Sequence, residues 1–129
     1  MSETNDKTCR DDLVELTFLE SLNRRMPDDT EVCKALADLY TRVGRYEDGL
    51  ALDTKLSRLC HDEPLVWYNL GCSYALLNRT DEALDALARA IRLGYRDWLW
   101  MAQDDDLRVL HKEERFAAIV RGMAGGSGA

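Results

Sequence analysis

The chain has 129 residues, 46% of them hydrophobic and 32% charged, and its formal net charge is −7. This length suits one domain, and no apolar run approaches the roughly 20 residues of a membrane-spanning helix. Because the basic residues are scattered among acids, the composition argues against a nucleic-acid or anionic-membrane surface. We therefore expect no nucleic-acid partner and no membrane.

The N-terminal residues are polar and lack the apolar core of a secretory signal. We expect residues 1–8 to be disordered and the protein to be cytoplasmic. Without a secretory signal, an even number of cysteines does not imply disulfides. The expected reduced thiols are Cys9, Cys33, Cys60 and Cys72.

The first predicted helix covers residues 9–25, where Leu13, Leu16, Leu19 and Leu22 recur near helical spacing. Thr8 followed by Asp11 is a variant capping box that would open this helix. No matching helix precedes it, so it is interpreted as the second helix of a half repeat.

Two later segments match each other at an offset of 34 residues, as a helical repeat of that length should. Both pairs of helices are predicted from the apolar spacing, at residues 29–43 and 46–60 and then at 63–77 and 80–93. Gly44 and Asn78 fall where such a helix pair needs a left-handed residue. The matched residues are Leu36 and Leu70, Ala37 and Gly71, Tyr40 and Tyr74, Arg45 and Arg79, Gly49 and Ala83, and Leu50 and Leu84.

The pattern changes after Gly94. The run Asp104 to Asp106 predicts a helix cap that holds Leu107 and Leu110, rather than a cation loop, because its acids are consecutive. A last amphipathic helix is predicted from Phe116, Ile119, Val120 and Met123. Trp98 and Trp100 are two residues apart, so at most one is expected to pack inward and the other would mark a contact surface.

The second repeat resembles the tetratricopeptide repeat (TPR) family. Its residues Trp67, Leu70, Gly71, Tyr74 and Ala83 reproduce the family pattern, with Leu87 in place of the usual Phe. The segment after Gly94 is similar to the degenerate closing repeat of bacterial TPR proteins.

This resemblance implies an all-α fold, an α-solenoid of antiparallel helix pairs with about two and a half repeats and C-terminal capping helices. A single domain is expected at residues 9–122, followed by a flexible tail at 123–129. Its parts would be a half repeat at 9–29, repeats at 30–63 and 64–97, and a closing segment at 98–122.

No constellation for catalysis or metal binding stands out. Cys60 and His61 are adjacent, and neighbouring residues seldom point at one ion. Both histidines, His61 and His111, fall in predicted turns without a nucleophile motif. We expect no enzyme activity, no metal and no cofactor.

The family resemblance implies that the first helix of each repeat lines a concave binding groove. The residues it places there as partner contacts are Lys34, Asp38, Thr41, Tyr68, Asn69 and Cys72. Leu65 lies on the same predicted face as Asn69. Some TPR domains bind the C-terminal carboxylate of chaperones there, but Asp38 would repel a carboxylate, so that activity is not predicted.

The leading functional hypothesis is an adaptor that binds a peptide or protein segment in this groove. One alternative is a self-associating structural solenoid, because the half repeat leaves Leu13 and Phe18 without a partner helix. The expected oligomeric state is a monomer or a weak homodimer. Another alternative is a small acidic TPR chaperone of a bacterial secretion system.

Overall fold

The computed structural model describes the backbone of residues 3–127 and the side chains of residues 10–125. This part of the chain contains seven α-helices and one 3₁₀ helix, and it has no strand. The prediction of an all-α fold made of helix pairs is confirmed. None of the described helices is both long enough and apolar enough to span a bilayer. The chain divides between Leu59 and Cys60 into two compact units.

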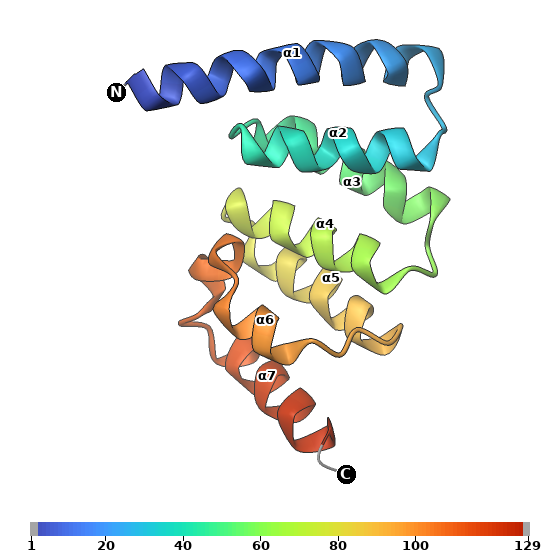
Figure 1. The fold of residues 1–129 in the computed structure, drawn as a ribbon. Coiled ribbons are helices and arrows are strands. Elements are labelled where there is room, and N and C mark those ends of the chain that lie inside the picture. The colour runs from blue at the N-terminus through green and yellow to red at the C-terminus, as the bar shows by residue number, and fades with distance from the viewer. Residues whose placement is uncertain (1–2, 128–129) are drawn as a thin grey trace. The chain divides into compact units, whose positions relative to one another are not determined.

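The first unit contains α1 (Glu3–Arg25), α2 (Thr30–Arg42) and α3 (Tyr46–Leu59). Helix α2 packs against both neighbours (Figure 1). Asp29 caps α2, since its Oδ1 accepts hydrogen bonds from the amides of Glu31 and Val32 at 3.0 and 3.1 Å. The core of this unit includes Leu16, Leu19, Leu36 and Leu39, which are all buried.

Helix α1 begins earlier than the sequence predicted. Residues 3–8 are helical rather than disordered, and Thr8 lies inside the helix instead of capping it. These residues include no glycine or proline, so nothing in them breaks a helix. One face of α1 carries the exposed apolar side chains of Leu13, Val14 and Phe18.

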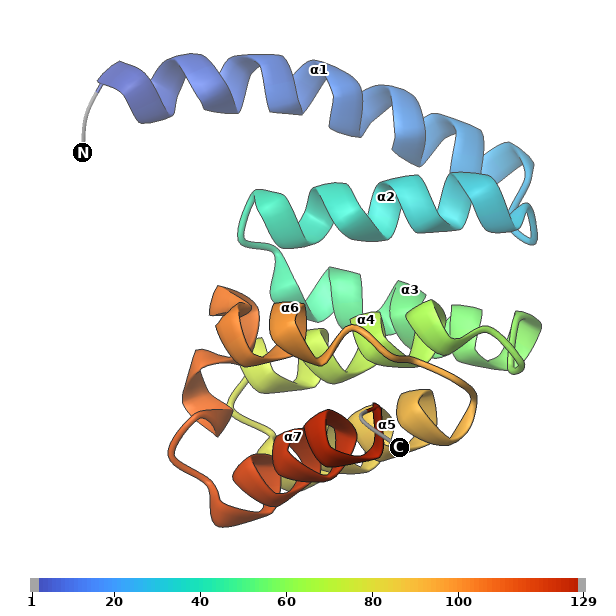
Figure 2. The same ribbon diagram turned by 60° about the horizontal axis from the view of Figure 1, so that its bottom comes forward.

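The second unit contains α4 (Pro64–Leu76), α5 (Thr80–Arg92), α6 (Trp98–Gln103), η1 (Asp105–Leu110) and α7 (Glu114–Ser127). Helix α4 packs against α5 and η1, and α7 packs against α5 and α6 (Figure 2). The core of this unit includes Leu84, Leu87, Met101, Leu107 and Leu110, all fully buried. Helix α7 continues to Ser127, so residues 123–127 are helical where a flexible tail was predicted.

The four repeat helices α2 to α5 begin and end within one residue of the predicted positions. The left-handed residues between each pair are confirmed, with φ of 87° at Gly44 and 61° at Asn78. Only glycine, and to a lesser extent asparagine, adopts this backbone readily.

The turn within each repeat has the same side-chain contacts, 34 residues apart. The Arg45 guanidinium lies 4.8 Å from the Tyr40 ring centre, and its Nε donates to Asp48 at 2.8 Å. The second copy uses Arg79 over Tyr74 at 5.1 Å, with Nε donating to Glu82 at 2.7 Å. The residues that match at an offset of 34 in the sequence therefore make equivalent contacts in the two turns. Each turn is stabilised by a cation that lies over an aromatic ring.

Helices α4 and α5 approach each other closely at Gly71. A Cβ atom there would lie 2.9 Å from Leu87 Cδ2 and 3.2 Å from the backbone oxygen of Ala83. Both of these neighbours are fully buried. The glycine is therefore required by packing, and the small residue in the family pattern has a direct steric reason.

Candidate functional site

Three of the predicted groove residues lie on α2, in the first unit. Asp38 is exposed, and its Oδ2 lies 3.4 Å from Arg42 Nη1. Lys34 is half-buried and lies one turn earlier, with its Nζ 3.9 Å from Glu31. Residues four apart share one face of a helix. This part of α2 is therefore an open, charged surface.

Thr41 does not belong to that open surface. Its Oγ1 lies 3.1 Å from the position that a Cβ on Gly49 would occupy. The Thr41 side chain therefore faces α3. This orientation differs from the predicted position of Thr41 in a groove. Gly49 has no side chain, so α2 and α3 come close together at this point.

Tyr68, predicted to line the groove from α4, is only 3% exposed. Its hydroxyl donates a hydrogen bond to Asp104 Oδ2 at 2.6 Å. Its ring stacks on Tyr95, with the ring centres 4.5 Å apart and the planes 13° apart. Burial away from water raises the pKa of Tyr68 above its ordinary value.

Cys72 shares this environment, since its Sγ lies 3.8 Å from the same Asp104 oxygen and its side chain is buried. The other Asp104 oxygen accepts a hydrogen bond from the Asp106 amide at 3.0 Å, which confirms the predicted cap. The structure thus differs from the expectation of an open groove at Tyr68 and Cys72. Both are covered by the closing segment, because Asp104 needs polar partners where it is buried.

Asn69 is the groove residue of α4 that stays exposed. Leu65 lies one turn before it and is 61% exposed. The pair forms an open stripe on a helix most of whose other side chains are buried or partly buried. An apolar side chain beside an amide suits contact with a peptide, since the amide both donates and accepts hydrogen bonds.

Burial of Tyr95 predicts a loss of stability in alkali. Desolvation raises its pKa to about 12, above the value of about 10 in the unfolded chain. The folded state therefore holds this proton more tightly, so the stabilisation is complete below pH 10 and is lost as the pH rises through 12. Urea unfolding from pH 9 to 12 should show this decline. In Tyr95→Phe, the loss of unfolding free energy over this pH range should be smaller by about 2 kcal/mol. An unchanged dependence on pH would contradict the assignment to Tyr95.

The short helix α6 presents apolar side chains to solvent. Trp100 is 54% exposed, and its amide donates to the capping Asp97 carboxylate at 3.1 Å. Leu99 beside it is also exposed, whereas Trp98 is half-buried. This confirms that at most one of the two tryptophans packs inward. An exposed tryptophan is a common anchor of protein contacts.

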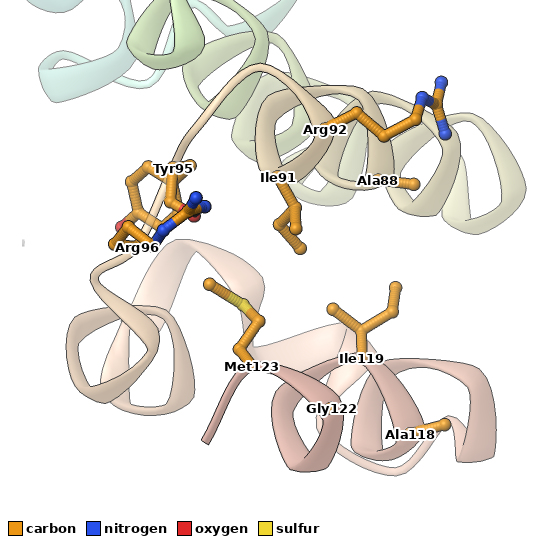
Figure 3. Close-up of a pocket in the computed structure, with 9 residues that line it drawn as sticks. All are labelled: Ala88, Ile91, Arg92, Tyr95, Arg96, Ala118, Ile119, Gly122 and Met123. Carbon is orange, nitrogen blue, oxygen red and sulfur yellow. Dashed lines mark hydrogen bonds between the residues drawn. The ribbon is translucent and has the colours of Figure 1, made fainter. Parts of the chain in front are cut away.

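A pocket of about 530 Å³ lies in the second unit between α5 and α7 (Figure 3). Ile91 of α5 points toward Ile119 and Met123 of α7. Arg92 and Arg96 also line it. No residue of this pocket was singled out from the sequence as a contact, although the apolar periodicity of α7 indicated one of its walls.

Residues 64–97 match the family model of the tetratricopeptide repeat. This segment is a tetratricopeptide repeat. Its Trp67 donates from Nε1 to the His61 carbonyl at 3.0 Å and lies 4.8 Å below the Arg89 guanidinium. Repeats of this family are protein-interaction modules, and the repeat in this chain has the helix pair and packing of that class.

A curated relative supports the same resemblance over more of the chain. The chain is 31% identical over 85 residues to a chloroplastic protein of Arabidopsis thaliana. The match covers 64% of this chain and 25% of the relative. The chain thus spans about a quarter of the length of that protein.

Proposed function

We propose that this chain binds a peptide or protein segment through the first helices of its repeats, without catalysing a reaction. The observation that carries the proposal is the open stripe of Leu65 and Asn69 on α4. Leu65 and Asn69 are the two exposed residues of α4, whereas the rest of this helix is buried or partly buried. Lys34 and Asp38 supply a comparable open stripe on α2.

The two stripes differ in chemistry. The α2 stripe is charged, and Arg42 links it to α1 through Glu15 at 3.3 Å and Asp12 at 3.7 Å. The α4 stripe combines an apolar side chain with an amide. Charged rim contacts add orientation more than affinity, so we expect Leu65 and Asn69 to contribute more binding energy than Lys34 and Asp38.

Affinity capture from the native proteome tests this function. The full chain and a Leu65→Ala/Asn69→Ala variant serve as baits, and captured proteins are quantified by mass spectrometry. We expect the captured amount of a defined partner to be at least tenfold lower with the variant than with the wild type, because truncation removes the apolar anchor and the amide.

The matched control is Glu47→Ala/Arg108→Ala, which changes two exposed side chains elsewhere. Circular dichroism establishes that both variants are folded. If both variants capture the same proteins in the same amounts as the wild type, the α4 stripe is not the contact surface. Conversion of a small-molecule substrate by the purified chain would contradict the absence of catalysis.

A further inference from the structure

The pocket between α5 and α7 has the build of a helix-binding groove. Small residues on both helices, Ala88, Ala118 and Gly122, line it alongside the larger apolar ones. A Cβ added at Gly122 would meet nothing within 4 Å, so the groove is open there. Small residues let another backbone approach closely, and the apolar ones offer surface for burial.

The apolar walls are held in place by the core beneath them. Ile91, Ile119 and Met123 are each partly buried and pack against the cluster that includes Leu87 and Phe116. Their exposed portions therefore need little ordering when a partner binds. A preformed apolar surface of this kind lowers the entropic cost of association.

Among the side chains that the structure describes, two arginines at this groove lack the acidic partners that Arg79, Arg108, Arg115 and Arg121 have. Arg92 and Arg96 are exposed, and across residues 10–125 neither forms an ion pair with an acidic side chain. Arg96 donates to the neighbouring Tyr95 carbonyl at 3.4 Å. By contrast, Arg115 pairs with Asp85 at 2.7 Å. In a chain of net charge −7, this leaves a local positive potential beside an apolar groove.

We propose that this groove docks an amphipathic helix of a partner protein that carries acidic residues beside its apolar face. The apolar residues would enter between Ile91, Ile119 and Met123, and the acids would face Arg92 and Arg96. Helix α5 lines the groove from Ala88 to Arg92, so about two turns of a partner helix would lie against it. When an amphipathic helix binds in an apolar groove, its residues at i, i+3, i+4 and i+7 make the contacts. It uses a different surface from the proposed α4 stripe.

A helical peptide library displayed on phage tests the proposal. Its members have about 14 residues, enough for two turns in the groove and about one more turn at each end. Leucine is fixed at i, i+3, i+4 and i+7, and the flanking positions are varied among Glu, Gln and Lys. We expect the full chain to enrich Glu at the flanks. The affinity of the best peptide, measured by fluorescence anisotropy, should fall at least tenfold with Arg92→Glu/Arg96→Glu.

A second variant tests the groove without changing charge. Gly122→Leu places a side chain into open space and should weaken peptide binding at least tenfold while leaving the fold intact. The matched charge control is Arg25→Glu/Arg58→Glu, which reverses two exposed arginines of the first unit and should change the affinity less than twofold.

Several results would overturn the proposal. These are the absence of any binder, enrichment of Lys or of no charge at the flanks, or a peptide affinity that survives both groove variants. Light scattering supplies one more: a dimer that Gly122→Leu dissociates would show that the groove takes a second copy of this chain instead. The α4 stripe variant should leave peptide binding unchanged, so failure here is distinct from failure of the proposed function.

Discussion

Asp104→Ala is expected to lower the free energy of unfolding of the second unit by about 3 kcal/mol. The substitution removes the cap of η1, which is worth about 1 kcal/mol. It also leaves the buried Tyr68 hydroxyl without its acceptor, at a cost of about 1–3 kcal/mol. The same side chain makes both hydrogen bonds, so the effects arise together. Urea unfolding at pH 7 measures the loss.

Asp97→Ala is the matched control, because Asp97 also caps a helix but is exposed. It should cost about 1 kcal/mol. A loss for Asp104→Ala no larger than this would show that the contact with Tyr68 contributes nothing. In a double-mutant cycle with Tyr68→Phe, the combined loss should be smaller than the sum by about 1 kcal/mol.

Gly71→Val should destabilise the second unit by about 3 kcal/mol, near the upper end of typical overpacking effects. The new side chain would meet Leu87 Cδ2 and the Ala83 backbone oxygen. Leu87 is fully buried within the core cluster, and the carbonyl moves only if α5 moves. Thermal and urea unfolding both report this change.

Gly122→Val provides the comparison, since it introduces the same side chain into a helix where nothing lies within 4 Å. Both variants replace a helical glycine with the same β-branched residue, so propensity changes are alike. We expect Gly122→Val to stay within about 1 kcal/mol of the wild type. Equal losses for the two glycines would contradict a steric role for Gly71.

The helices of the two repeats were predictable because their signals are local. Apolar spacing determines which face of each helix is buried, and Gly44 and Asn78 determine where two of the helices end. The predicted Asp104 cap is local in the same sense, since it joins residues two apart. Each of these features can be recognised within one or two turns of helix.

The candidate site was less predictable because its exposure depends on distant residues. A repeat register indicates the face on which Tyr68 lies, but the residue that covers it is 36 positions away. Only packing decides that the closing segment returns to this face. The orientation of Thr41 was more predictable than the burial of Tyr68. The small residue at Gly49 already indicated a close helix contact, and Thr41 is the side chain that lies nearest to it.

The α5–α7 groove shows a third kind of limit. The sequence indicated an apolar face on α7, yet a pocket depends on the space left between two helices, which no periodicity reports. The charge environment of Arg92 and Arg96 is equally invisible in the sequence, because acids occur throughout the chain.

The division at Leu59 has a spectroscopic consequence. All three tryptophans, at positions 67, 98 and 100, lie beyond it. Indole fluorescence therefore reports the unfolding of the second unit, whereas far-ultraviolet circular dichroism sums the helices of both. Comparing the two transitions in one sample would show whether the units melt together, without any label being attached to the protein.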